Sequence, residues 1–264
     1  MAKIALQNVS VEYPIYNLST RSFKKDFIKL ATGGSIGKNK QKQIIVKAIN
    51  NVSFNLQNGD RVGLLGHNGA GKSTLIKLIA GIYEPTSGEI QIEGNISSLI
   101  NLNLGIEQEY TGYENIFIRG IIAGLSKKQI KAQVKEIIEF TGLGDYIHMP
   151  TRTYSKGMML RLAFAISTSI NPEILLIDEV FGAGDASFRE KAQQKLSNVL
   201  DSANIVIMAN HTVKIIQDFC NKAMILEGGR CKFFGDTKEA IDIYENTKTQ
   251  RKNNQKSVMV AEEI

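Results

Sequence analysis

The feature that most constrains how this chain can fold is a glycine-rich turn at residues 66–74, set between a short apolar run and a helix-like pattern. It matches the phosphate-loop pattern G-x-x-x-x-G-K-[ST] at every fixed position: Gly66, Gly71, Lys72 and Ser73. Residues with little side chain let backbone N–H groups close around phosphate oxygens, and the following helix offers its positive end to the same anion. We therefore predict a nucleoside triphosphate site made by Gly66, His67, Asn68, Gly69, Ala70, Gly71, Lys72, Ser73 and Thr74.

The rest of the composition is that of a globular protein with an excess of positive charge. The 264 residues suffice for one large domain or a domain with an inserted lobe, and 43% of them are apolar. No apolar run approaches the ~20 residues that a bilayer requires, and the N-terminus lacks a signal-peptide pattern. The two cysteines, Cys220 and Cys231, fit a reducing cytosol. The net charge of +6 suggests an anionic neighbour, either a membrane surface or nucleic acid.

Strand and helix patterns alternate along the chain. Alternating or continuous apolar runs predict strands at 3–13, 52–56, 89–93, 174–177, 205–208 and 223–226. Residues 113–146 change to a helical period, with a capping box at Ser126 and Gln129 and a terminating glycine at Gly142. We therefore expect an α/β fold: a P-loop NTPase with a β-sheet core and an α-helical lobe inserted at about 101–165.

Two segments depart from this pattern. Residues 14–45 form a basic insertion, in which Phe23, Phe27 and Leu30 have helical spacing over 21–31. That segment is either a solvated surface insertion that rests on its own domain or a helix that faces a membrane or a partner. Residues 246–264 are rich in charge, so we expect a flexible tail after a domain at 1–245.

Two carboxylates close the apolar strand at 174–177. Asp178 is placed to hold the Mg²⁺ of the nucleotide, together with the Ser73 hydroxyl, while Lys72 reaches the β- and γ-phosphates. Glu179 is the candidate to orient or deprotonate the attacking water. His211 follows the next strand, and ligands of open parallel sheets bind at the carboxyl ends of strands, so its imidazole is a candidate contact of the γ-phosphate.

A third signal, Tyr154-Ser155-Lys156-Gly157-Met158, precedes a helical run. Serine and glycine at a helix start provide a second anion-ready N-terminus, although an ordinary N-cap has the same composition. The order of phosphate loop, helical lobe, this S-x-G, the Asp-Glu strand and a later histidine resembles the ATP-binding-cassette (ABC) ATPases over about residues 1–240. The resemblance implies the ABC type of P-loop fold, with a mixed β-sheet core.

The resemblance also implies roles for individual residues. Residues 154–158 stand at the family's signature sequence, where Ser155 and Gly157 are the expected γ-phosphate contacts, and Lys156 and Met158 replace the usual glycine and glutamine. Asp185 belongs to the dimer-facing loop, 182–185, and His211 is the switch histidine. For the glutamine that reaches the metal, the match is Asn101, with Asn103 as the alternative. Tyr13 is the expected platform for adenine, with Tyr16 as the alternative.

Finer motifs narrow the resemblance. Leu104-Gly105, the segment 111–116, the Tyr-Ser-x-Gly-Met signature and the insertion at 14–45 are similar to ATP-binding subunits of bacterial polysaccharide exporters of the O-antigen, capsule and teichoic-acid types. Some members carry a C-terminal carbohydrate-binding domain, which we do not expect here. The resemblance implies ATP and Mg²⁺ as cofactors, a homodimer that sandwiches ATP, two copies of an integral-membrane permease that residues 101–116 contact, and a peripheral position on the cytoplasmic face of the cytoplasmic membrane. The polysaccharide would be handled only indirectly, and no nucleic acid is expected. The alternatives are a soluble cassette ATPase acting on nucleic acid or ribosomes, and an importer ATPase.

Overall fold

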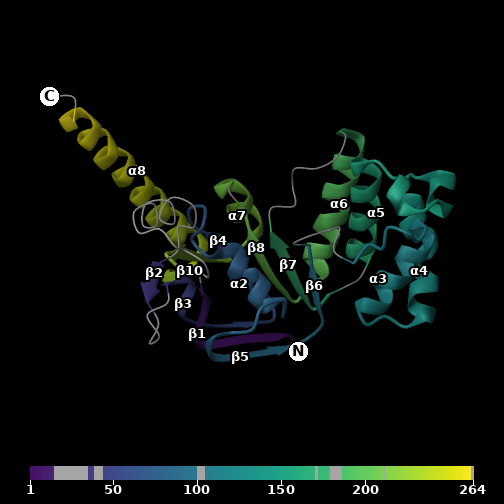
Figure 1. The fold of residues 1–264 in the computed structure, drawn as a ribbon, viewed down its shortest axis with the longest axis horizontal. Coiled ribbons are helices and arrows are strands. Elements are labelled where there is room, and N and C mark those ends of the chain that lie inside the picture. Colours follow the sequence, from purple (N-terminus) through teal and green to yellow (C-terminus); the bar gives the residue numbers. More distant parts are fainter. Residues whose placement is uncertain are drawn as a thin grey trace. The chain divides into compact units, whose positions relative to one another are not determined.

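The computed structural model describes residues 1–14, 35–38, 44–99, 105–169, 172–178, 186–210 and 212–262 (Figure 1). The chain divides into two compact units, one of Met1–Ala2 with Gly94–Val206 and the other of Lys3–Glu93 with Ile207–Ile264. Within the described ranges, none of the helices combines the length and the apolarity needed to cross a bilayer.

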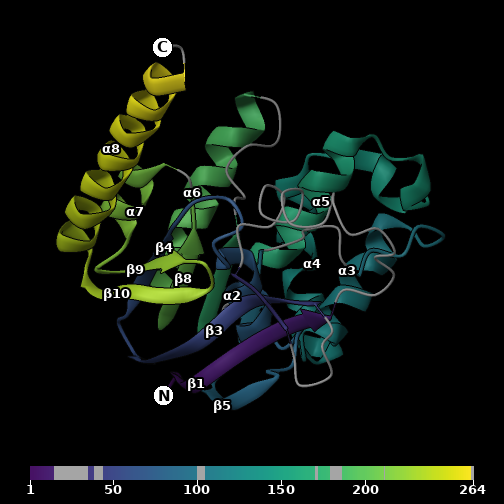
Figure 2. The same cartoon turned by 60° about the vertical axis from the view of Figure 1, so that its left-hand side comes forward.

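The unit that carries the phosphate loop contains an antiparallel sheet with the strand order β2-β3-β1-β5. Figure 2 labels β3, β1 and β5 of this sheet. Its strands are β1 (Lys3–Pro14), β2 (Ser35–Lys38), β3 (Ile44–Gln57) and β5 (Ser87–Glu93). Val52, Phe54 and Leu56 of β3 are buried, whereas the residues between them are exposed. This period of two places one face of the strand against the core and the other in water.

The same unit contains three strands of mixed direction. β4 (Arg61–Leu65) pairs in parallel with β9 (Lys222–Glu227), and β9 pairs antiparallel with β10 (Arg230–Asp236). The helices of this unit are α2 (Lys72–Ile79), α7 (Val213–Phe219) and α8 (Thr237–Glu262). β4 is buried along Val62–Leu65 and leads directly into the phosphate loop, so the loop starts from a strand fixed in the core.

The C-terminal segment differs from our expectation of a flexible tail at 246–264, because helix α8 continues to Glu262 (Figure 1). The helix starts firmly: Asp236 Oδ1 accepts hydrogen bonds from the backbone N–H of Lys238 and Glu239, and Ala240 and Ile241 are buried. Nucleation is the costly step of helix formation, and no glycine or proline interrupts 237–262. A polar sequence can therefore continue the helix well beyond its buried first turns.

The other unit contains the helical lobe predicted at about 101–165. Helices α3 (Gly112–Ile122), α4 (Lys127–Thr141) and α5 (Lys156–Ser169) form it, with short 3-10 turns at Gly144–His148 and Thr151–Thr153. The same unit contains helix α6 (Ala186–Ser202), which follows strand β7 (Ile174–Asp178). The capping box of Ser126 and Gln129 is confirmed, and Gly142 ends α4 in the left-handed conformation (φ 62°). The core of the lobe holds Ile116, Ile130, Ile137, Leu143, Ile147, Leu162, Ala165 and Ile166.

Strands β6 (Ile96–Ser98) and β7 (Ile174–Asp178) pair in parallel in this unit. Residues Ile174–Ile177 are fully buried, as a continuous apolar run predicts for a parallel strand covered on both faces. The buried strand β8 (Ile205–Ala209) includes the point at which the chain passes from this unit to the other.

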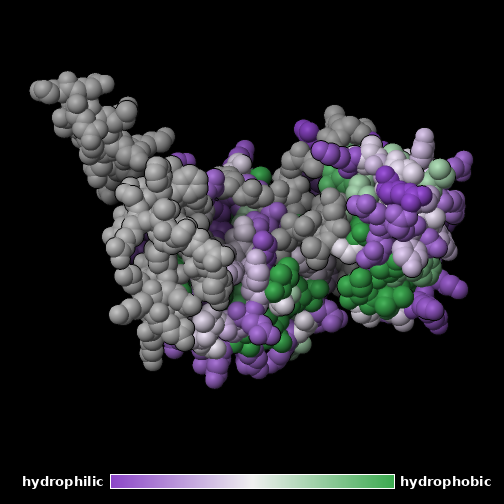
Figure 3. Space-filling model, viewed as in Figure 1, coloured by the Kyte–Doolittle hydropathy of each residue, from purple (hydrophilic) through white to green (hydrophobic). Residues whose placement is uncertain are grey.

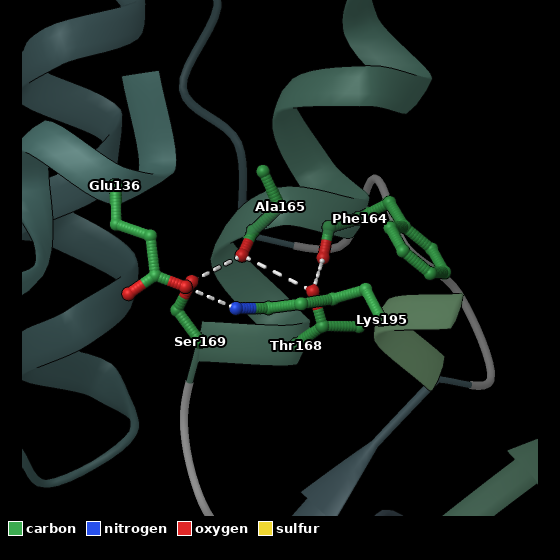
Figure 4. A network of polar contacts seen from close by, with 6 residues as sticks. All are labelled: Glu136, Phe164, Ala165, Thr168, Ser169 and Lys195. Carbon is green, nitrogen blue, oxygen red and sulfur yellow. Dashed lines mark hydrogen bonds and ion pairs between the residues drawn. The ribbon is translucent and has the colours of Figure 1, made fainter. Parts of the chain in front are cut away.

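Helices α4, α5 and α6 are joined by an aromatic cluster and by one ion pair. The rings of Phe140, Phe164 and Phe188, one from each helix, have centroids 5.5–6.0 Å apart. The Lys195 ammonium of α6 pairs with the Glu136 carboxylate of α4, beside Thr168 and Ser169 of α5 (Figure 4). The helix that follows the predicted signature is thus held between its two neighbours.

Candidate functional site

The phosphate loop connects β4 to α2, and its glycines adopt a backbone conformation that other residues avoid. The φ angles of Gly66, Gly69 and Gly71 are 154°, 77° and 110°. A Cβ at Gly66 would lie 2.5 Å from the carbonyl oxygen of Leu226, and a Cβ at Gly71 would lie 2.6 Å from that of Ala48. Both distances are shorter than any real contact, so the loop can close only with glycine at these two positions.

Backbone hydrogen bonds fix the loop to the strands around it. The Ala70 N–H donates to His67 O at 3.1 Å, and the Gly229 N–H donates to Ala70 O at 3.0 Å. Gly229 O in turn accepts from the N–H of Asn50, a residue of β3. The loop is therefore held in position by β3 and by the turn between β9 and β10.

Lys72 and Ser73 open helix α2 as the motif requires. The Lys72 side chain is buried, and its Nζ donates to Gly66 O at 2.7 Å and to His67 O at 3.2 Å. No side chain caps this helix end and its first turn contains no acidic residue, whereas the Ser73 side chain is exposed. The positive end of α2 is thus combined with one ammonium group and one hydroxyl, a set that suits a phosphate chain.

Tyr13, the expected adenine platform, lies next to this helix. The Thr74 and Tyr83 side chains both influence the pKa of its hydroxyl, Tyr83 upward and Thr74 downward. Burial, followed by the neighbouring Tyr83, raises the pKa of Tyr13 to about 12, so the phenol is neutral at physiological pH. The structure therefore brings Tyr13 and the end of the phosphate loop together in one unit, and stacking on a base stays a prediction.

The signature segment begins helix α5 in the other unit. The Ser155 Oγ accepts a hydrogen bond from the Met158 N–H at 3.2 Å, as an N-cap does, and Ser155, Lys156 and Gly157 are exposed. Tyr154 fixes the segment to the preceding 3-10 turn, because its hydroxyl donates a hydrogen bond to Tyr146 O at 2.6 Å. The helix start is thus both anchored and accessible.

The acidic strand end is described as far as Asp178. This residue ends β7 and is partly exposed, while the four residues before it are buried. Its carboxylate and the Ser73 hydroxyl are hard oxygen donors, the kind of ligand that Mg²⁺ prefers. The donor chemistry therefore fits the predicted metal.

Several predicted residues lie outside the described part of the chain. They are Glu179, His211, Asn101 with its alternative Asn103, Asp185 with the rest of 182–185, Tyr16, and the helix proposed at 21–31.

Sequence analysis did not find two residues at the Tyr13 end of the site. Tyr83 follows α2, and its ring meets that of Tyr13 edge to face, with centroids 5.7 Å apart and planes at 74°. The Lys77 ammonium lies 5.8 Å from the centroid of the Tyr83 ring. No sequence pattern links a tyrosine of this turn to the end of β1, so neither residue carried a signal.

The chain is similar in sequence to known ATP-binding proteins. A protein-family profile described as "ABC transporter" matches residues 49–182. The O-antigen export system ATP-binding protein RfbE of Yersinia enterocolitica is 44% identical over 229 residues, which cover 87% of this chain and 96% of that protein. The teichoic acids export ATP-binding protein TagH of Staphylococcus epidermidis is 38% identical, with 92% of this chain and 88% of that protein covered.

The chain is also similar to part of a longer protein and to solved structures of ATP-binding cassettes. TagH of Bacillus anthracis is 37% identical over 97% of this chain, which spans 44% of that protein. Among solved structures, a dimeric ATP-binding cassette in a post-hydrolysis state with ADP and Pi has a TM-score of 0.65 at 21% identity, with 89% of this chain and 98% of that chain covered. At that identity the likeness concerns the fold, which agrees with the expected α/β P-loop architecture.

Proposed function

Because this chain belongs to the ABC transporter family, as an ATP-binding subunit with ATPase chemistry, we propose that it drives the export of a cell-surface polysaccharide across the bacterial cytoplasmic membrane. The observation that carries the proposal is the 44% identity to RfbE over 96% of that protein, which is named for O-antigen export. The relatives named for teichoic acid export support the same class of cargo, a long hydroxyl-rich polymer.

ATP is bound by the phosphate loop and hydrolysed by positioned charge. The backbone N–H groups of 66–74, the positive end of α2 and the Lys72 ammonium neutralise the phosphates. The Ser73 hydroxyl and the Asp178 carboxylate would hold Mg²⁺, which would supply charge neutralisation at the phosphates. Glu179 orients or deprotonates the attacking water, and His211 contacts the γ-phosphate.

Two copies complete the sites between them. In this arrangement the exposed start of α5 in one copy, with Ser155 and Gly157, covers the triphosphate held by the other copy. Because neither copy alone surrounds the γ-phosphate, hydrolysis depends on closure of the dimer. Asp185 in the dimer-facing loop and Asn101 near the metal take part in the same closed state.

Closure is transmitted to two copies of a permease through the helical lobe. Figure 3 shows apolar surface gathered where helix α3 ends, a region that includes Ile121 and Ile122, which are 51% and 71% exposed. Tyr110 and Tyr113, within the expected contact segment 101–116, are also exposed. Exposed apolar side chains in a contiguous area favour burial by another protein, which supports a permease contact at this end of the lobe. In the proposed assembly the chain is a peripheral subunit on the cytoplasmic face of the membrane.

Replacement of Glu179 by glutamine tests the proposal. We expect Glu179→Gln to bind ATP with unchanged affinity and to lose at least about 100-fold in phosphate release, because the water is no longer activated. Glu89→Gln, an exposed carboxylate on β5, is the matched control and retains full turnover.

The export step is tested in cells of the host bacterium. Cells with Glu179→Gln as their only copy should lose surface polysaccharide and accumulate the polymer inside, while Glu89→Gln cells remain normal. Normal surface polymer in the Glu179→Gln cells, or a salt-sensitive nucleic-acid complex of the purified protein in place of a membrane complex, contradicts the proposal.

A further inference from the structure

The turn that follows helix α2 holds a tyrosine against the expected adenine platform. The ring edge of one of the pair, Tyr13 and Tyr83, points at the face of the other, with centroids 5.7 Å apart. Such a T-shaped contact is a favourable geometry for aromatic side chains. The Tyr13 ring, which lies at the end of strand β1, is therefore held by a residue from outside that strand.

Tyr83 is itself fixed by helix α2. The N–H groups of Ile82 and Tyr83 donate to Lys77 O at 2.9 and 3.4 Å, and the Lys77 ammonium lies over the Tyr83 ring, 5.8 Å from its centroid. A cation at this distance from an aromatic face is attracted to it. The orientation of Tyr83 is therefore set by the helix whose first turn carries the phosphate-binding residues.

The Tyr13 hydroxyl is also influenced by the same helix. The Thr74 side chain lowers the pKa of that hydroxyl, and Thr74 and Lys77 are neighbours on one face of α2 because they are three residues apart. The strand end is tied as well: the Glu12 N–H donates to Thr86 Oγ1 at 2.9 Å, and the Thr86 N–H donates to Ser10 O at 2.8 Å. Contacts therefore run from helix α2 through Lys77 and Tyr83 to the ring of Tyr13.

We propose that Tyr83 is a positioning residue that acts through Tyr13, so that the base platform stands at a fixed place relative to the phosphate loop. A nucleotide with a planar base then meets a platform that is already oriented, and it loses less freedom on binding. Without Tyr83 the Tyr13 ring can rotate away from the base, while the phosphate-binding groups stay in place. The inference rests on the proposed role of Tyr13 as the surface on which adenine stacks.

The test compares a ligand that has a base with one that has none. Tyr83→Leu should weaken the binding of ATP about tenfold, the order expected for one base stacked on an aromatic ring. It should leave the affinity for inorganic tripolyphosphate unchanged, because that ligand contacts only the loop. Tyr83→Phe keeps the ring, so its affinity for ATP should stay within about threefold of that of the wild-type protein. Ile82→Ala, an exposed neighbour in the same turn, is the control and changes neither affinity.

A double-mutant cycle with Tyr13→Ala shows whether Tyr83 acts through Tyr13. We expect the double variant to bind ATP no more weakly than Tyr13→Ala alone. Lys77→Met, which keeps the apolar stem, should weaken ATP binding less than Tyr83→Leu and in the same ligand-selective way, which provides the test even where Tyr83→Leu fails to fold.

The outcomes separate the inference from its premise. Equal loss of ATP and tripolyphosphate binding in Tyr83→Leu and Lys77→Met would mean a general structural role and overturns the inference. Unchanged ATP affinity in Tyr13→Ala removes the base platform from the proposed function. A loss in Tyr13→Ala with none in Tyr83→Leu keeps the platform and rejects the role of Tyr83.

Discussion

Gly71 stands where the chain has no room for a side chain. Its φ of 110° is unfavourable for any other residue, and an added Cβ would lie 2.6 Å from Ala48 O. We expect Gly71→Ala to lower the free energy of unfolding by about 1–3 kcal/mol and to abolish ATP binding, because the displaced loop no longer points its N–H groups at the phosphates. Urea denaturation and titration calorimetry measure the two effects.

Gly81, just after the other end of the same helix, is the matched control. Its φ is 72°, but an added Cβ would meet nothing within 4 Å. Gly81→Ala should therefore show a similar backbone strain while ATP still binds. Full ATP affinity in Gly71→Ala would contradict the assignment of this loop as the phosphate site.

The difference between local and distant contacts explains which site residues the sequence predicted. Gly66, Gly71, Lys72 and Ser73 form one short motif, so their spacing alone predicts the conformation that the structure has. The N-cap at Ser155 was equally local and is also found. Tyr83 meets Tyr13 only because β1, α2 and the turn after it fold together, and such a contact leaves no periodic pattern.

At the level of elements, we expect apolar packing to outweigh the ion pair in joining α4, α5 and α6. Phe164 of α5 is 4% exposed and touches the rings of Phe140 and Phe188. Truncation of such a side chain leaves a cavity, so Phe164→Ala should lower the free energy of unfolding by about 3–5 kcal/mol. Glu136→Gln should lower it by less than about 1 kcal/mol, since the Glu136 side chain is 64% exposed and water screens its pairing with Lys195. Chemical denaturation followed by circular dichroism measures both changes.

Glu139→Gln is the control for the charge change. Glu139 lies on the same helix and faces Lys135 at 3.9 Å, with both side chains well exposed. Glu139→Gln should lower the free energy of unfolding by no more than Glu136→Gln does. A loss in Glu136→Gln as large as that in Phe164→Ala would mean that the ion pair, and not the ring cluster, holds α4 to α6.

The elements that sequence analysis missed have a common physical cause. Strand β10 follows Gly228-Gly229, a two-residue turn typical of hairpins, but its own residues alternate only weakly between buried and exposed. Helix α8 was not predicted at all, and residues 246–264 were expected to form a flexible tail because they are rich in charge. Both elements depend on packing at one end, β10 against β9 and α8 through its buried first turns, and composition does not record that dependence.

For the whole molecule, the fold class could be predicted because the order of motifs along the chain is specific to one architecture. The α/β P-loop fold of the ABC type, with a mixed sheet and a helical lobe, is confirmed by the family profile and by the similarity to solved ATP-binding cassettes.

Dimerisation driven by ATP is the prediction that concerns the whole molecule, and Ser155 is the residue that tests it. Ser155→Ala removes both the cap of α5 and the predicted phosphate contact, so a loss of about 1 kcal/mol in stability would accompany any loss of dimer. Ser155→Asp separates these roles, because aspartate caps a helix as well as serine does and its charge favours the helix start. The comparison is made by light scattering with ATP present, in proteins that all carry Glu179→Gln. We expect dimers when Ser155 is retained, fewer dimers with Ser155→Ala, and none with Ser155→Asp, because its carboxylate would face the triphosphate of the other copy. Dimers of Ser155→Asp at the same protein concentration would mean that the start of α5 does not cover the nucleotide.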